Sequence, residues 1–331
     1  MRRLFVLITA MSLLAAACGD DTSDTPTTVA AVTTTTQAPT TQAPTTTTTQ
    51  AAPEGISFTG ADGTEVTITD STRIISLNGD ITEILFAIGA GDRVIAVDVT
   101  TTYPPEALAI GPPIGFGQRL AAEPIIGLNP TLVIGDEQIG PPEVIDQIRA
   151  AGIPVAIITL ESQLSGIRTK IETVAALVGE ETAGATLAEA VDAEIDEAIA
   201  LAATASSTPK VAFVYARGPE ALLLFGPGSV TSALFAGANA TDSVQGPPVG
   251  PLTPEALAAA NPDFFVTSEA AVGSLGGPQA FADLPGVAQT TAGQEGALLV
   301  YDDALFLGFG PRTGEALRTL VLDLHPELAG N

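Results

Sequence analysis

Tyrosine and arginine side chains in predicted loops are the groups of this sequence best suited to bind a ligand. Tyr103 lies in a Thr-Tyr-Pro-Pro segment just past the predicted strand 94–97, whereas Tyr215 and Tyr301 lie in or at the ends of predicted strands. A phenolate oxygen is a hard donor that suits ferric iron, and open α/β sheets bind ligands at the carboxyl ends of their strands. Residue type and place alone favour the simpler interpretation, an amphipathic loop residue held by two prolines.

Three arginines lie in predicted loops beside glycines, namely Arg119, Arg217 and Arg312. A guanidinium in such a loop can form two hydrogen bonds with a carboxylate, so these side chains are candidates to hold an anionic ligand. Each arginine alone is more often a surface or structural residue. Phe116 and Phe309 lie near two of them and could pack against a flat apolar ligand, although core packing is the more frequent role.

Two glutamates occupy equivalent places in an internal repeat. Glu123 and Glu255 are each followed at the sixth and seventh positions by Asn-Pro and then by an apolar run, and residues 81–87 are echoed by residues 230–236. This shared order predicts two similar lobes, and two lobes form a cleft between them. The simplest role for the glutamates is to stabilise the N-terminus of a short helix.

Composition excludes several functions. The formal net charge of −26 argues against nucleic-acid binding, which needs a basic surface. His325 is the sole histidine and Cys18 the sole cysteine, so a zinc site of histidine and cysteine is excluded and a catalytic triad would need a tail residue. No dinucleotide or phosphate-loop fingerprint is present. We therefore expect a binding protein and not an enzyme, although a hydrolase with paired carboxylates remains an alternative.

The N-terminal residues predict export. A basic Arg2-Arg3 pair precedes an apolar run that is too short to span a bilayer. The run ends in Ala-Ala-Ala-Cys-Gly, which resembles a bacterial lipobox with Cys18 as the lipidated residue; an ordinary secretory signal is the alternative. Residues 1–17 are thus a predicted signal peptide. Residues 18–54 are rich in Thr, Ala and Pro and predict a tether at the extracytoplasmic face of the cell membrane.

The rest of the chain alternates strand and helix patterns, which predicts an α/β fold with parallel sheets. Asp80 and Glu83 have the spacing of a capping box at the start of a helix. A nearly continuous helical pattern, weakest at Gly179, predicts a long rigid helix that joins two similar α/β lobes with the ligand in their cleft. The predicted parts are an N-terminal lobe, a helical connector and a C-terminal lobe, at residues 55–162, 163–208 and 209–331.

Several motifs together resemble the N-terminal lobe of helix-linked (class III) substrate-binding proteins of ABC importers. The motifs are Arg73-Ile-Ile-Ser-Leu77, Thr82-Glu-Ile-Leu-Phe-Ala87, Gly91-Asp-Arg-Val94 and Thr102-Tyr-Pro-Pro105, and the resemblance extends from about Ile56 to the C-terminus. Members of this family carry cobalamin, ferric siderophores or haem. The haem-binding branch is the most similar, on residues 101–104, 140–144 and 307–313.

The resemblance implies a site and partners. By this resemblance Tyr103 would be the axial ligand of haem iron, and we favour that role over the amphipathic loop residue considered above. The three loop arginines would hold the haem propionates. Glu123 and Glu255 would meet arginines of a permease dimer that works with its ATPase, an interpretation we favour over helix stabilisation. We expect a monomer with no catalytic cofactor.

One segment departs from the haem-binding pattern. Residues 246–251 offer neither the histidine nor the tyrosine that the resemblance to the haem-binding branch implies for the second lobe. A five-coordinate haem on Tyr103, or a different sixth ligand, would follow. A ferric siderophore or cobalamin remains the alternative ligand.

Overall fold

The computed structural model describes residues 55–330 of the 331-residue chain. The predicted signal peptide, the linker and Cys18 lie outside the described residues. Within residues 55–330, no helix has both the length and the apolar character needed to cross a membrane.

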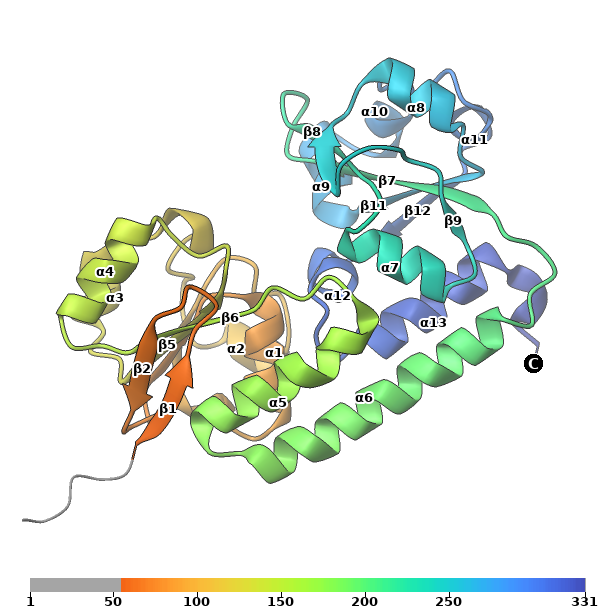
Figure 1. The fold of residues 1–331 in the computed structure, drawn as a ribbon. Helices are drawn as coiled ribbons and strands as arrows, with labels where there is room; N and C mark the ends of the chain where they lie inside the picture. Colours follow the sequence, from red (N-terminus) through yellow and green to blue (C-terminus); the bar gives the residue numbers. More distant parts are fainter. Residues whose placement is uncertain (1–54, 331) are drawn as a thin grey trace, which may run out of the picture. The chain divides into compact units, whose positions relative to one another are not determined.

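The first part of the fold is a hairpin followed by a parallel sheet, which we call the N-lobe (Figure 1). The hairpin strands β1 and β2 pair antiparallel on either side of Asp62-Gly63. The sheet has the order β4-β3-β5-β6. The strands are β1 (Ile56–Thr59), β2 (Glu65–Ile68), β3 (Ile74–Ser76), β4 (Val94–Val97), β5 (Leu132–Asp136) and β6 (Val155–Ile158). The helices are α1 (Gly79–Ala87), α2 (Pro105–Leu108), α3 (Ala122–Gly127) and α4 (Pro142–Ala150), with 3-10 turns η1 (Gly91–Arg93) and η2 (Gly117–Arg119).

Apolar residues cover both faces of this sheet. Ile74 and Leu132 belong to one buried cluster, while their strand neighbours Ile75 and Val133 belong to a second one. Successive residues of a strand point to opposite faces, so both faces are packed. This explains why the strands are nearly continuous apolar runs, as expected for a parallel sheet.

The connector differs from the single helix that the sequence predicted. It consists of a 3-10 turn and two helices, η3 (Leu164–Gly166), α5 (Ile167–Val178) and α6 (Glu181–Ala202). Gly179 has a φ of 74°, a left-handed conformation that ends α5 and lets the chain reverse. Figure 1 shows the two helices side by side. A Cβ at Gly184 would lie 2.2 Å from the Ala175 Cβ, so this glycine permits their close contact.

The C-lobe is a mixed sheet of order β10-β8-β7-β11-β12, with β9 paired to β7. β11 pairs parallel with both β7 and β12. β8 pairs antiparallel with both β7 and β10. The strands are β7 (Lys210–Ala216), β8 (Leu222–Phe225), β9 (Thr241–Asp242), β10 (Val249–Pro251), β11 (Phe264–Ser268) and β12 (Leu298–Tyr301). The helices are α7 (Val230–Gly237), α8 (Pro254–Ala260), α9 (Glu269–Leu275), α10 (Pro278–Ala282), α11 (Thr291–Glu295), α12 (Asp303–Leu307) and α13 (Thr313–Leu324), followed by η4 (Pro326–Leu328).

The internal repeat corresponds to equivalent elements of the two lobes. The repeated seven-residue segments lie in α1 and α7. The two Asn-Pro pairs follow α3 and α8, and Asn129 and Asn261 have positive φ values of 49° and 36°. Asparagine tolerates this left-handed conformation, which ends each helix before the buried strands β5 and β11. The prediction of two similar α/β lobes is confirmed.

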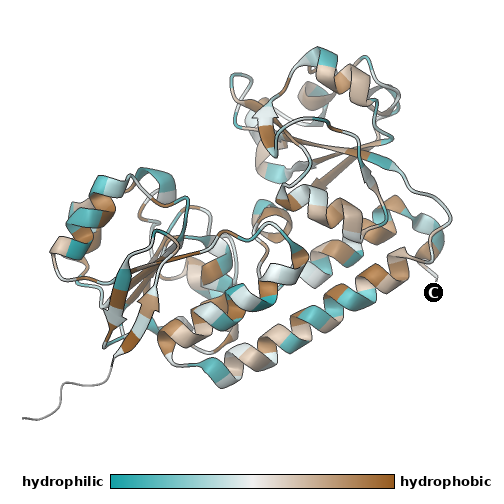
Figure 2. Cartoon of the chain, viewed as in Figure 1, coloured by the Kyte–Doolittle hydropathy of each residue, from teal (hydrophilic) through white to brown (hydrophobic). Residues whose placement is uncertain are grey.

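The connector helices share one apolar core with both lobes. A single cluster of buried residues includes Ile81 of α1, Ile171 of α5, Val191 of α6 and Leu317 of α13. Figure 2 shows apolar and polar residues interspersed along α6. Because this core is continuous, the lobes are held by packing as well as by the covalent chain.

Candidate ligand-binding site

The loop that carries Tyr103 begins with a hydrogen-bonded turn at the carboxyl end of β4. Asp98 Oδ1 accepts hydrogen bonds from the backbone nitrogen and the hydroxyl of Thr100, at 3.1 and 2.7 Å. The Thr100 hydroxyl oxygen in turn accepts the Gly79 N–H of α1 at 2.9 Å. Thr101 is buried, and its hydroxyl lies 3.1 Å from that of Thr82. These contacts fix the backbone two residues before Tyr103.

Tyr103 lies where the two lobes meet. Its side chain is 42% exposed, and the Arg312 guanidinium carbon lies 4.0 Å from the centre of its ring. Arg312 precedes α13 in the C-lobe, whereas Tyr103 belongs to the N-lobe. A guanidinium over an aromatic face is an attractive arrangement. The phenol is therefore accessible at the lobe junction with a cation on one ring face.

Arg312 is also paired with a buried carboxylate of the N-lobe. Its Nε donates to Glu83 Oε2 at 3.0 Å, and its Nη2 donates to Glu83 Oε1. The Glu83 side chain is only 5% exposed. Because this two-point contact uses one edge of the guanidinium, Arg312 is less available to a ligand than the sequence suggested.

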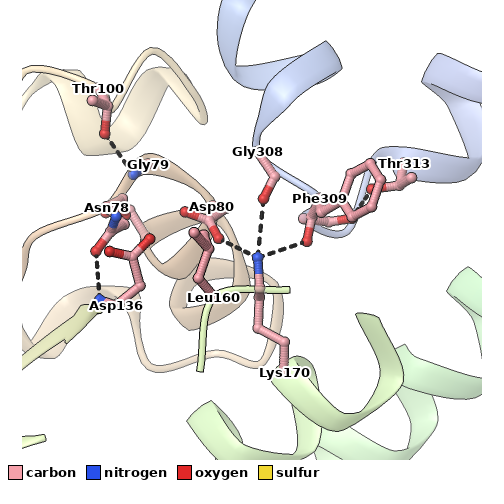
Figure 3. A network of polar contacts seen from close by, with 12 residues as sticks. Asn78, Gly79, Asp80, Thr100, Asp136, Leu160, Lys170, Gly308, Phe309 and Thr313 are labelled. Carbon is pink, nitrogen blue, oxygen red and sulfur yellow. Dashed lines mark hydrogen bonds and ion pairs between the residues drawn. The ribbon is translucent and has the colours of Figure 1, made fainter. Parts of the chain in front are cut away.

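A lysine on the connector forms hydrogen bonds with residues of both lobes (Figure 3). Lys170 Nζ donates to Asp80 Oδ2 at 2.6 Å and to the carbonyl oxygens of Gly308 and Phe309 at 3.0 and 3.2 Å. The Lys170 side chain is 2% exposed, and its three ammonium hydrogens are matched by these three acceptors. One residue therefore links α1, α5 and the loop before Arg312.

The predicted capping box at the start of α1 is wrong. The N-cap residue is Asn78, and its side chain makes no capping hydrogen bond. Asp80 and Glu83 instead lie one turn apart and turn their carboxylates towards Lys170 and Arg312. The spacing that resembles a capping box thus serves contacts with the connector and the C-lobe.

The Gly308-Phe309-Gly310 segment allows its loop to approach α1 closely. A Cβ at Gly308 would lie 2.6 Å from the Ala304 carbonyl oxygen, and one at Gly310 would lie 3.4 Å from the Asp80 Cβ. Phe309 is buried in the shared core and does not face a ligand. The glycines therefore have a packing role, and the sequence interpretation of Phe309 as a core residue is confirmed.

The other two candidate arginines do not contact Tyr103. Arg217 follows β7 and pairs with Asp303 at 2.9 Å, and its guanidinium carbon lies 4.5 Å from the centre of the Tyr215 ring. Arg119 ends η2, is exposed, and makes no ion pair with any residue in the range 55–330. Of the three arginines, Arg119 is the one whose charge is not matched by a carboxylate of the described residues.

Exposed apolar side chains lie on both lobes. Phe116, between β4 and α3, is 53% exposed, and Val249, the first residue of β10 in the segment without histidine or tyrosine, is 47% exposed. Tyr103 and Phe116 both follow β4, and Leu160, which is also exposed, follows β6. Carboxyl ends of neighbouring parallel strands lie at one edge of a sheet, so these three residues belong to the same edge.

Glu123 and Glu255 occupy the equivalent positions that the repeat predicts. Each is an exposed residue in the first turn of a short helix, α3 in the N-lobe and α8 in the C-lobe. Neither forms an ion pair with the described residues. Both carboxylates are therefore accessible to another protein.

Buried carboxylates lie beneath the Tyr103 loop. Burial raises the pKa of Asp98 to about 7, although hydrogen bonds from Thr100 and Gly117 and the nearby Asp80 charge also act on it. Burial likewise raises the pKa of Asp136, whose Oδ1 accepts the Gln138 N–H at 2.8 Å. Both groups are buried and hold backbone turns.

A scan against family models matches residues 74–305 to the periplasmic binding protein family. The chain belongs to this family. The match covers the sheets of both lobes and both connector helices. The two-lobed α/β fold agrees with the architecture inferred from the sequence, whereas the connector has two helices where a single one was predicted.

Three similar proteins illustrate the range of relatives. The solved apo structure of the periplasmic haem-binding protein RhuT from Roseiflexus sp. RS-1 is 42% identical, has a TM-score of 0.75, and covers 78% of this chain and all of that one. The ABC transporter substrate-binding lipoprotein YvrC of Bacillus subtilis is 25% identical over 82% of this chain and 86% of that protein. The vitamin B12-binding protein of Vibrio campbellii is 37% identical, but only over 30% of this chain and 36% of that protein.

Sequence reasoning missed the residues that join the lobes. Lys170 and Asp80 are separated by 90 positions, and Glu83 and Arg312 by 229. The sequence does hold one indication of such pairs, because the chain has only 12 lysines and arginines against 38 acidic residues. A lysine inside an apolar helix pattern such as that of α5 indicates a buried ion pair.

We predict that Asp98→Asn will change how stability depends on pH. Because burial raises the pKa of Asp98 in the folded state above its unfolded value, its contribution to stability is complete below about pH 4 and is lost as the pH rises to about 7. The wild type should thus lose up to about 1.4 kcal/mol per pH unit relative to the variant across this range. Urea unfolding of both proteins between pH 4 and 8 measures the difference. An unchanged difference across the range would contradict the assignment.

Proposed function

We propose that this protein captures ferric haem and delivers it to an ABC importer. The accessible Tyr103 phenol at the lobe junction carries the proposal, because a tyrosinate oxygen is an established kind of axial ligand for ferric haem. Exposed Phe116 and Val249 offer apolar surface to a flat macrocycle. The similarity to RhuT, a haem-binding protein, supports the same ligand across both lobes.

The arginines have different proposed roles. Arg119 is exposed and makes no ion pair with a carboxylate of residues 55–330, so it can form charge-assisted hydrogen bonds with a propionate without giving up such a pair. Arg217 can reach a propionate only by sharing or leaving Asp303. Arg312 remains part of the proposed site mainly through its contact with the Tyr103 ring.

Cobalamin is the second candidate ligand, because a vitamin B12-binding protein is among the relatives. That match covers less than a third of this chain, whereas the match to RhuT covers 78%. Cobalamin also offers no ferric iron to the tyrosine. Titrations of the purified soluble part with hemin, ferric siderophores and cobalamin distinguish the ligands directly.

We predict that Tyr103→Phe will remove the tyrosinate-to-iron charge-transfer band of the hemin complex and weaken hemin binding at least about tenfold, or about 1.4 kcal/mol. This variant keeps the aromatic ring beneath Arg312 and removes only the oxygen that would bind iron. Absorption spectra and hemin titrations provide the measurement. Tyr301→Phe is the control, since Tyr301 is buried and donates to Asp323 at 2.7 Å. A normal spectrum for the Tyr103 variant would reject Tyr103 as the ligand.

We further propose that Glu123 and Glu255 dock the protein on a permease dimer, one glutamate on each half. Their equivalent, exposed positions in two similar lobes suit a partner with two similar basic sites. The similarity to YvrC, a substrate-binding lipoprotein of an ABC transporter, supports this kind of partner. Such charge pairs set orientation more than affinity.

We predict that the double variant Glu123→Lys/Glu255→Lys will bind hemin normally and fail to support uptake in cells. Two attractive contacts would become repulsive ones, at a cost on the order of several kcal/mol, and each single variant should be milder. Hemin titration and cellular uptake are measured in parallel. If the double variant loses hemin binding, the glutamates belong to the ligand site. If it binds hemin and supports normal uptake, the glutamates only stabilise helix N-termini.

We also propose that lipidation of Cys18 anchors the protein outside the cytoplasm, as the sequence before it suggests. Cys18→Ala should release the protein from the membrane, because the described residues contain no helix able to cross it. Fractionation after a high-salt wash is the measurement. A variant that stays in the membrane fraction would show that another feature holds it there.

A further inference from the structure

Glu83, Arg312 and Tyr103 form a chain of side-chain contacts across the lobe junction. Glu83 and Tyr103 belong to the N-lobe and Arg312 to the C-lobe. Glu83 accepts two hydrogen bonds from the Arg312 guanidinium, and the central carbon of that guanidinium lies over the Tyr103 ring, 4.0 Å from the ring centre. The carboxylate thus contacts the arginine but is not itself the group that faces a ligand.

The loop before Arg312 is fixed by contacts other than Glu83. Lys170 binds the Gly308 and Phe309 carbonyl oxygens, and Gly310 packs on Asp80 of α1. Lys170 thereby sets where the Arg312 backbone lies. Glu83 then sets where the end of that long side chain points, because a two-point contact with a planar guanidinium restricts both position and orientation.

We propose that Glu83 is a positioning residue for the ligand tyrosine, acting through Arg312. The inference rests on the proposed function of Tyr103 as an iron ligand. A tyrosine that binds ferric iron carries additional negative charge, and a cation at its ring face stabilises that charge. Since Arg312 comes from the opposite lobe, this stabilisation also requires the lobes to be joined as the structure has them.

The first test uses the protein without ligand. The chain has three tyrosines, so ¹³C-tyrosine labelling gives three ring environments that Tyr103→Phe assigns by difference. Glu83→Gln removes the charge that holds Arg312, and Arg312→Lys removes the planar group. Both should shift the Tyr103 ring resonances and leave those of Tyr301 in place. Unshifted Tyr103 resonances in both variants would overturn the proposed positioning.

The matched control is another glutamate–arginine pair of the same chain. Glu180 pairs with Arg93, which ends η1 just before β4, whereas Tyr103 follows the carboxyl end of that strand. Glu180→Gln should therefore lower stability without changing the Tyr103 resonances. If this control shifts them as Glu83→Gln does, the effect is a general loosening of the fold and the proposal fails.

The second test uses hemin. Glu83→Gln and Arg312→Lys should each shift the tyrosinate-to-iron band and weaken hemin binding by roughly tenfold, whereas Glu180→Gln should do neither. Loss of stability alone, with an unchanged band and affinity, would assign Glu83 a structural role only. Should Glu83→Gln not fold, Arg312→Lys and the shorter Glu83→Asp give the same comparison. If the wild type itself binds no hemin, the proposed function fails, while the tyrosine resonances still test whether Glu83 positions Arg312.

Discussion

The ammonium group of Lys170 is the contact on which the lobe junction most depends. Burying an unpaired charge is very unfavourable, and so is burying an unpaired carbonyl. Here one charge satisfies the Asp80 carboxylate of α1 and two backbone carbonyls of the loop before Arg312 at once. Removing the lysine would leave three unmatched acceptors, so the N-lobe, the connector and the C-lobe loop are stabilised together.

An acidic chain with few cations pairs several of them with its own carboxylates. Lys170 and Arg312 are matched by Asp80 and Glu83, and Arg217 by Asp303. Arg119 is thus the exception among the candidate ligand-binding arginines. Since a ligand carboxylate must compete with protein carboxylates for a paired guanidinium, an unpaired arginine is the more effective partner for it. Local pairing, and not the number of arginines near a cleft, therefore decides which of them can hold an anion.

The sequence predicted elements that depend on local patterns. The repeated segments and the Asn-Pro pairs that follow two helices were recognised because turn-forming residues and apolar spacing are visible in adjacent positions of the sequence. The break at Gly179 was recognised only as a weak point. Whether a chain kinks or reverses there depends on the contact of α5 with α6, which a one-dimensional pattern does not contain.

The contents of the site were less predictable because they depend on distant pairings. Tyr103 was identified from its loop, but its contact with Arg312 joins residues more than two hundred positions apart. Asp80 and Glu83 were assigned to a capping box because that role needs only local neighbours. Their true partners come from the connector and the C-lobe, and no local pattern distinguishes the two roles.

The repeat itself explains why the proposed site is asymmetric. In the aligned segments of α1 and α7, Ser229 and Ser232 stand where the N-lobe has Asp80 and Glu83. The Ser229 hydroxyl caps its own helix by accepting the Ser232 N–H at 3.2 Å, so this pair satisfies a backbone donor of α7 itself. The N-lobe carboxylates instead bind cations from other elements. Two similar lobes can therefore form one junction with acids on one side and a cation on the other, and Tyr103 lies beside it.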